Sequence, residues 1–149
     1  MRKLNRKGFT LAELLIVVAI IGVLVAVSLP IFTAQLEKSR ESTDIANLRA
    51  AKAEAVSLYL VGDVSDTASC TWTDTNDPGK GFTAYYNAKT GKLQASSSGI
   101  DGYGAGSATV GSEANTDFNY VPATAVTKKV IQVVVDANGN CTFSWVAAN

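Results

Sequence analysis

Apolar residues are concentrated near the start of the chain, in one stretch of membrane-spanning length. No charged side chain occurs from Leu14 to Leu29, and the apolar pattern as a whole extends from Phe9 to Phe32. A helix needs about 20 apolar residues to cross the hydrocarbon core of a bilayer. The pattern therefore predicts a transmembrane helix over residues 9–32.

Residues 33–61 have the composition of a second, amphipathic half of the same helix. Leu, Ala, Glu, Lys, Arg and Gln dominate from Ile31 to Leu60, and neither Gly nor Pro interrupts them. This composition favours a helix, and we expect a single continuous helix of roughly 50 residues.

The amphipathic half carries two stripes at helical spacing and one charged side. One stripe predicts a face for a partner and consists of Phe32, Leu36, Thr43, Ala46, Ala50, Ala53 and Leu60. A second stripe lies nearby and consists of Ile45, Leu48, Ala55 and Tyr59. The spacing of Glu37 with Arg40, and of Arg40 with Asp44, predicts a side that faces water.

The composition changes after Leu60, and residues 62–149 have the pattern of a β-rich head domain. Gly62-Asp63 is a stop signal for the helix, and the residues beyond it are rich in Gly, Ser, Thr, Asn and Asp. Turn residues and short β-prone runs predict two hairpins, formed by residues 82–86 with 92–95 and by residues 129–135 with 141–146. We expect one antiparallel sheet packed on the helix, and hence an α+β fold.

Three details of the head follow from local patterns. Val133, Val134 and Val135 are consecutive apolar residues, which predicts a strand covered on both faces. Residues 141–145 alternate instead, which predicts one buried face. Residues 96–115 are nearly all small or polar and predict a long glycine-rich loop.

Two charged features flank or enter the apolar stretch. Residues 1–7 hold four basic side chains and no acidic one, so the amino end of the following helix is expected to stay cytoplasmic. Glu13 lies inside the apolar stretch, where a carboxylate costs on the order of +2.5 to 3.5 kcal/mol at the helix centre. It is therefore a candidate functional residue that needs a cationic partner. The alternative is a carboxylate near the lipid headgroups, since about 6 Å of helix separates it from Phe9.

The sequence K-G-F-T-L-A-E at positions 7–13 resembles the leader and cleavage site of type IV pilins and the related pseudopilins. The resemblance covers about the first third of the chain, and Ala12 departs from the β-branched residue that the family more often has. It implies that a prepilin peptidase cuts after Gly8, which makes residues 1–8 a leader, and then methylates the amino terminus of Phe9. It also implies that Glu13 of an incoming subunit pairs with the Phe9 amine of its neighbour, and that the fold is type IV pilin-like.

The resemblance implies a set of partners and a location. The partners are other copies of the chain in a helical filament, the prepilin peptidase, membrane lipid before assembly, and an inner-membrane assembly platform with an ATPase motor. The precursor would cross the cytoplasmic membrane once, and the assembled pilus would lie at the cell surface and serve adhesion, motility or DNA uptake. A pseudopilin of a type II secretion or competence system would share the same amino-terminal third and stays an alternative.

Gly22 and Pro30 are the weak points of the long helix. Pro costs ~3 kcal/mol in a helix interior, and Gly is the costliest ordinary residue after it. One interpretation is a bend that a membrane helix tolerates. The other, which the resemblance implies, is a segment that unwinds and lengthens as subunits pack or the filament is pulled.

An ordinary secretory signal is a further alternative, with a cut near residues 26–28 and a mature secreted binding module that begins near Leu29. Such signals have an apolar core of about 7 to 15 residues, whereas this stretch is longer and contains Glu13. The helix-compatible pattern also continues beyond Pro30, which argues against the cut.

Cys70 and Cys141 leave two alternatives open. An exported chain with an even number of cysteines fits a disulfide, and closing a loop of this length would contribute about 4 kcal/mol in the chain-entropy model. The wide spacing departs from the carboxyl-terminal loop disulfide of Gram-negative pilins. The alternative is a pair of reduced, buried thiols.

Composition argues against catalysis and against a dedicated nucleic-acid surface. The chain has no His and no nucleophile, phosphate-binding or Cys-x-x-Cys motif, so no catalytic residue, cofactor or metal site is expected. Residues 136–140 resemble the start of a calcium loop, but Cys141 and Ala147 stand at its sixth and twelfth positions, where a Gly and a Glu are needed, and a hairpin turn explains them better. Removing the leader leaves nine basic residues against thirteen acidic ones, and no basic patch with interleaved aromatics appears.

Overall fold

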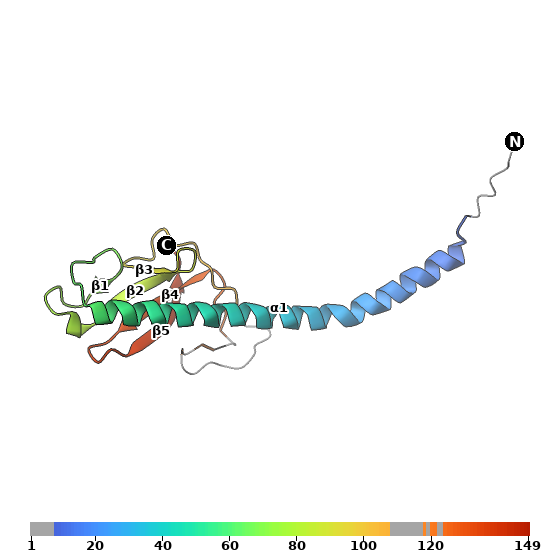
Figure 1. Cartoon of the computed structure of the whole chain (residues 1–149). Coiled ribbons are helices and arrows are strands. Elements are labelled where there is room, and N and C mark those ends of the chain that lie inside the picture. The colour runs from blue at the N-terminus through green and yellow to red at the C-terminus, as the bar shows by residue number, and fades with distance from the viewer. Residues whose placement is uncertain (1–7, 108–117, 119, 122–123) are drawn as a thin grey trace. The chain divides into compact units, whose positions relative to one another are not determined.

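The computed structural model describes residues 8–107, 118, 120–121 and 124–149 (Figure 1). The chain forms two compact units, with the boundary between Leu36 and Glu37. The predicted leader, apart from Gly8, and the later part of the predicted loop 96–115 lie outside the described residues.

Helix α1 spans Leu11–Val61, 51 residues in one element, and contains Pro30. It ends at Gly62, whose φ of 64° places it in the left-handed region and whose N–H donates to the Leu58 carbonyl at 3.0 Å. Glycine adopts this conformation without steric cost and is the common residue just past a helix end. The predicted continuous helix and its predicted end are confirmed.

Five strands follow the helix and form one antiparallel sheet in the order β1-β2-β4-β5, with β3 paired to β2. Their bounds are β1 Thr71–Trp72, β2 Phe82–Asn87, β3 Lys92–Gln94, β4 Lys129–Val135 and β5 Cys141–Ala147, and a short 3-10 helix, η1, spans Pro78–Lys80. Strand β4 pairs along one edge of β2, and β1 and β3 share the other edge. Strand β1 pairs with the first half of β2, at Phe82 and Thr83, and β3 pairs with the second half, from Tyr85 to Asn87. Both predicted hairpins are confirmed.

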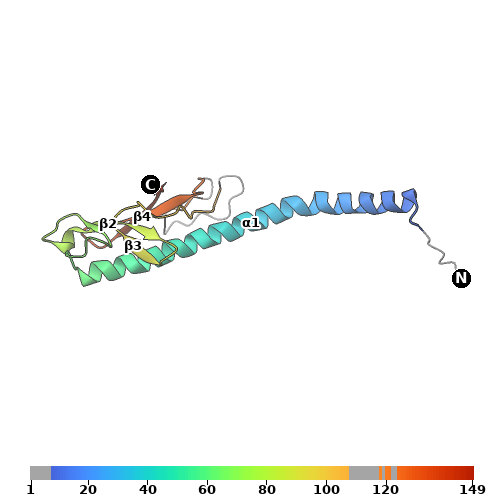
Figure 2. The same cartoon turned by 90° about the horizontal axis from the view of Figure 1, so that it is seen from above.

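The carboxyl part of α1 lies against one face of this sheet (Figures 1 and 2). Leu48, Ala51 and Ala55 on the helix are fully buried in one cluster with sheet residues that include Phe82 and Ile131. The small Ala side chains let the helix approach the sheet closely. The α+β fold with a long amino-terminal helix on an antiparallel sheet is confirmed.

The two predicted helix stripes have different environments. Leu48 and Ala55 of the second stripe are buried, and Ile45 and Tyr59 pack against the same core. The first stripe is exposed over most of its length, including Thr43. It therefore does not contact the sheet, and its use as a face for another copy stays a prediction.

Two burial predictions are wrong. Glu37 and Asp44, expected on the side that faces water, are buried. Val134 is 39% exposed between the buried Val133 and Val135, so β4 is not covered on both faces there. Only one face of the sheet carries the helix, and consecutive side chains of a strand point to opposite faces.

The predicted disulfide is absent, because Cys70 and Cys141 are free thiols. Cys141 begins β5, at one edge of the sheet, and Cys70 lies two residues before Trp72 of β1, at the other edge. Between these edges the strand pairs are Cys141 with Val135, Val135 with Phe82, and Phe82 with Trp72. Three spacings of about 4.8 Å place these two edges of the sheet about 14 Å apart. A disulfide joins Cα atoms about 4.4–6.8 Å apart, so the two thiols lie too far from each other.

Candidate functional site

The described residues that precede α1, residues 8–10, are exposed. Gly8 and Phe9 are exposed, and a Cβ added at Gly8 would meet nothing within 4 Å. The structure therefore leaves both sides of the predicted cleavage position unobstructed within the described part of the chain.

Glu13 closes the first turn of α1 together with Thr10. Its Oε2 accepts hydrogen bonds from the Thr10 amide at 2.8 Å and from the Thr10 hydroxyl at 2.7 Å. The Glu13 amide in turn donates to the Thr10 hydroxyl oxygen at 3.2 Å. This reciprocal arrangement is a capping box, which satisfies amides that a helix start otherwise leaves unpaired.

The capping box is a role for Glu13 that the sequence interpretation missed. Its signal, Thr followed by Glu three residues later at a helix start, is present in the printed sequence at Thr10 and Glu13. Both hydrogen bonds end on Oε2, whereas Oε1 makes none within the described residues. One oxygen of the carboxylate is thus available to a cation from outside the monomer.

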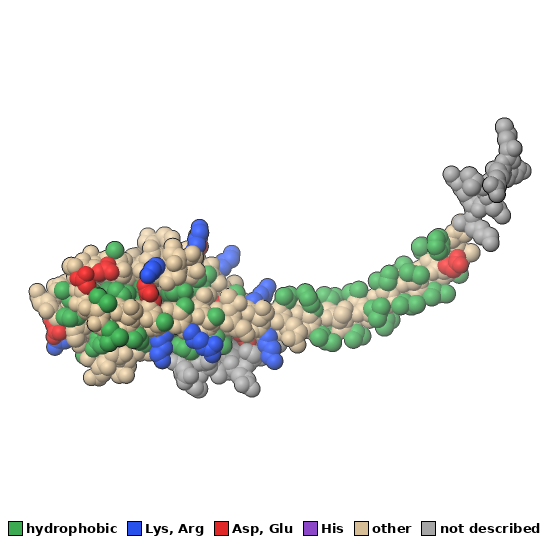
Figure 3. Space-filling model, in the orientation of Figure 1, with side chains coloured by type: hydrophobic (Ala, Val, Ile, Leu, Met, Phe, Trp, Pro, Cys, Tyr) green, Lys and Arg blue, Asp and Glu red, His purple; other side chains and the backbone are tan. Residues whose placement is uncertain are grey.

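The described part of the first unit presents an exposed apolar surface. Every residue from Gly8 to Thr33 is exposed, and the most apolar 18-residue window of α1 has a mean hydropathy of 3.1 with none of it buried. By length and composition the helix is able to cross a membrane. Figure 3 shows the hydrophobic side chains along this stretch.

Helix α1 is continuous through both Gly22 and Pro30. A Cβ added at Gly22 would meet nothing within 4 Å, so no close packing among the residues that the structure describes requires glycine there. Local lengthening of this segment stays a prediction.

A row of three acidic side chains is buried in the second unit. Glu37, Glu41 and Asp44, which we call the carboxylate row, are 5%, 1% and 0% exposed. They follow one another at spacings of four and three, so they share one face of the helix. Arg40 pairs with Glu37 at 3.4 Å, but 53% of the Arg40 side chain is exposed.

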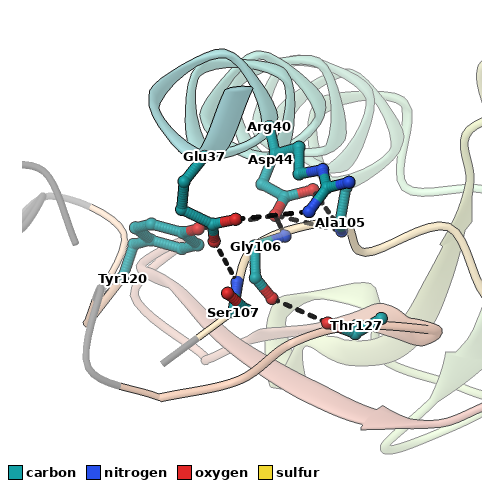
Figure 4. A network of polar contacts seen from close by, with 8 residues as sticks. All are labelled: Glu37, Arg40, Asp44, Ala105, Gly106, Ser107, Tyr120 and Thr127. Carbon is teal, nitrogen blue, oxygen red and sulfur yellow. Dashed lines mark hydrogen bonds and ion pairs between the residues drawn. The ribbon is translucent and has the colours of Figure 1, made fainter. Parts of the chain in front are cut away.

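We call the segment Gly102–Ser107 the strap, and its last three backbone amides point at Asp44 or Glu37 of the carboxylate row (Figure 4). The Gly106 amide donates to Asp44 Oδ2 at 2.8 Å, and the Ala105 amide lies 3.1 and 3.2 Å from the two Asp44 oxygens. The Ser107 amide donates to Glu37 Oε1. The Tyr120 hydroxyl lies 3.4 Å from Asp44 Oδ2.

The strap is wedged between α1 and residues 126–129, and its glycines allow the close approach. A Cβ at Gly102 would lie 2.0 Å from the Lys128 carbonyl oxygen, and one at Gly104 would lie 2.1 Å from that of Val126. A Cβ at Gly106 would lie 2.4 Å from the Tyr120 hydroxyl. The described part of the predicted loop is therefore an ordered, hydrogen-bonded element.

The two ends of the carboxylate row differ in pKa. Burial raises the pKa of Asp44, the nearby charge of Glu37 adds to the rise, and the hydrogen bonds described above oppose it without cancelling it. Burial also acts to raise the pKa of Glu37, but hydrogen bonds from Ser107 and Arg40 outweigh it, so that this pKa is lowered.

The turn at residues 136–140 is occupied by its own contacts. Asp136 accepts hydrogen bonds from the Asn138 and Asn140 amides at 2.8 and 2.9 Å and from the Asn140 side chain at 3.0 Å. It joins β4 to β5, so the interpretation as a hairpin turn is confirmed.

Comparison with known proteins adds independent findings. The family described as "Prokaryotic N-terminal methylation motif" matches residues 3–29. Fimbrial protein Q of Moraxella bovis is 33% identical over 116 residues, which are 76% of this chain and 74% of that protein. The Type IV major alpha-pilin of the same organism is 33% identical over 117 residues, with the same coverage.

A third relative has a higher identity over a shorter stretch. Fimbrial protein EcpC of Eikenella corrodens is 46% identical over 59 residues, 40% of this chain and 38% of that protein. No solved structure matches the chain.

Proposed function

Because this chain belongs to the type IV pilin family, we propose that it is the structural subunit of a type IV pilus, cut after Gly8 and assembled through its amino-terminal helix. The precursor crosses the cytoplasmic membrane once, with the leader inside, and the mature subunit becomes part of a filament at the cell surface. The prepilin peptidase cuts the leader and methylates Phe9, and an assembly platform with its ATPase motor extracts the subunit.

The uncovered apolar surface of residues 9–32 is the observation that carries this proposal. Apolar surface in water is unfavourable by roughly 25 cal/mol per Å², so a helix exposed along its whole length needs lipid or other apolar helices around it. Lipid supplies that environment in the precursor, and the helices of neighbouring copies supply it in the filament.

Glu13 and the amine of Phe9 provide a charge pair for assembly. The capping box holds the carboxylate with Oε2 on Thr10 and leaves Oε1 without a hydrogen bond among the described residues. A cationic amine on a neighbouring copy compensates the carboxylate, and the attraction is strong where water is excluded. The pair then sets the axial position of each incoming subunit.

The two alternatives are less well supported. The relatives reported above are named fimbrial proteins or a major pilin, which favours a pilus subunit over a pseudopilin. A secreted module cut near residues 26–28 disagrees with α1, which continues through these positions as one helix.

Intact mass and amino-terminal sequencing of the mature protein test the processing. We expect a chain that begins with methylated Phe9. A chain that retains Met1, or that begins near Leu29, would contradict the proposal.

A pair of glutamate variants tests the assembly role. We expect Glu13→Ala to leave the precursor in the membrane and to reduce filaments sharply, whereas Glu54→Ala, on the same helix but in the head, leaves filament yield unchanged. Abundant filaments from Glu13→Ala would rule out the charge pair, and the absence of long surface filaments containing the wild-type chain would favour a pseudopilin.

A further inference from the structure

The carboxylate row is unusual because Glu37 and Asp44, at its two ends, are buried with little cationic compensation. Among the described residues Arg40 forms an ion pair with Glu37, its side chain is 53% exposed, and Asp44 has no ion pair. Burying a carboxylate without compensation is strongly unfavourable. Some other group must stabilise these side chains.

Backbone amides of the strap provide this compensation. Three successive amides, at positions 105–107, donate to Asp44 or Glu37. Amides held in a fixed geometry stabilise an anion in the way that backbone nests do. The described residues contain no group of three or more His, Cys, Asp or Glu side chains arranged to hold a metal ion.

Residues 126–128 hold the strap in place through hydrogen bonds on the side away from the helix. The Val126 amide and the Thr127 hydroxyl both donate to the Gly106 carbonyl, at 3.1 and 3.0 Å. The Lys128 amide donates to the Gly104 carbonyl at 2.8 Å. Its amides are thus fixed against the helix by a second layer of hydrogen bonds.

The position of the carboxylate row along α1 gives this arrangement a further meaning. Glu37 directly follows Leu36, an exposed apolar residue and the last residue of the first unit. Without the strap, the carboxylates of Glu37 and Asp44 would lack their amide partners close in sequence to the apolar stretch through which the proposed filament assembles.

We propose that the strap covers the carboxylate row so that this part of α1 can be packed among other copies of the chain. The inference rests on the proposed filament. Like charges repeated in every subunit at the border of an apolar core repel strongly, since the effective dielectric there is low. The strap reduces this repulsion because its backbone amides donate hydrogen bonds to Glu37 and Asp44 within each subunit.

A pair of strap variants tests this role in the full-length chain. Gly104→Ala places a Cβ 2.1 Å from a backbone oxygen and must displace the strap. We expect filament yield to fall about tenfold or more, because one uncompensated buried charge changes an equilibrium by more than that. Gly91→Asn is the control, since Gly91 has a φ of 71° that Asn tolerates and nothing within 4 Å of an added Cβ.

Neutral side chains in the carboxylate row show whether the filament defect of Gly104→Ala comes from exposed charge or from a general loss of stability. Adding Glu37→Gln, Glu41→Gln and Asp44→Asn to Gly104→Ala should restore filaments to within about twofold of wild type, because no charge is left to cover. A combined variant as defective as Gly104→Ala alone would overturn the inference, as would normal filaments from Gly104→Ala.

Hydrogen exchange gives a second test that does not depend on a variant folding. The amides of residues 105–107 should be protected in the wild-type precursor and equally in the filament. Rapid exchange in the filament would overturn the inference. Neither result affects the proposed function, which depends on the mature amino terminus and on Glu13.

Discussion

Replacing Asp44 tests whether the carboxylate row stabilises the head. In Asp44→Ala, the amides of Ala105 and Gly106 lose their acceptor, and Tyr120 loses a hydrogen-bond partner. Hydrogen bonds to charged groups contribute about 1.5–3 kcal/mol each, and the gain from removing a buried anion offsets part of two such losses. We therefore expect Asp44→Ala to lower the free energy of unfolding by about 3 kcal/mol.

Thermal unfolding of the detergent-solubilised full chain measures this change. Trp72 reports on the core, since it is buried with its ring 5.2 Å from that of Phe82. A loss of about 3 kcal/mol corresponds to a midpoint lower by about 12 °C for a domain of this size. Asp44→Asn retains an acceptor oxygen and should cost less than about 1 kcal/mol.

Glu54→Ala is the matched control, an acid on the same helix. Its ion pair with Lys92, at 3.2 Å, leaves the Lys92 side chain mostly exposed, so its loss should cost less than about 1 kcal/mol. If Asp44→Ala destabilised the head no more than Glu54→Ala does, the strap amides would be satisfied by water, and the row would not hold the strap.

Three further predictions follow from other contacts. Burial raises the pKa of Asp44 above the 3.8 of a free carboxyl, so the folded protein binds this proton more tightly than the unfolded chain does. The stability that this shift contributes is present below the unfolded pKa and is lost as pH rises through the folded pKa. Wild type should therefore gain stability relative to Asp44→Asn on acidification, and no change with pH would contradict this. Thr10→Val should speed hydrogen exchange in the first turn of α1 by about fivefold, equivalent to ~1 kcal/mol of lost capping, and unchanged exchange would refute the capping box. Intact mass without reductant should show two free thiols, and burial raises the pKa of Cys70 to about 11, so alkylation of the native protein near pH 8 should be slow at that residue; a mass two protons lower would reveal a disulfide.

The long helix and the hairpins were predictable because local patterns determine them. The apolar stretch sets the first half of α1, Gly62 ends the helix, and the turn residues at 136–140 join β4 to β5. Each of these signals acts over a few residues of sequence. The pairing of Thr10 with Glu13 was equally local and could have been found from its spacing.

The carboxylate row and the disulfide depend on long-range arrangement. The spacing of Glu37 and Arg40 in the sequence is the same whether their side of the helix faces water or faces backbone amides 70 residues away. The separation of Cys70 from Cys141 follows from the strand order, which hairpin signals alone do not determine. The glycines at 102, 104 and 106 were a usable signal, since their alternation suits one side of an extended segment that approaches another backbone.

The strap meets the helix through main-chain groups, and this has a consequence for how the sequence can diverge. At positions 105 and 107 the amide does the binding, so a substitution that preserves the backbone keeps the contact with Asp44 or Glu37. The side chains at these two positions are therefore free to change without loss of the contact, whereas Gly102, Gly104, Gly106 and the two helix acids are not.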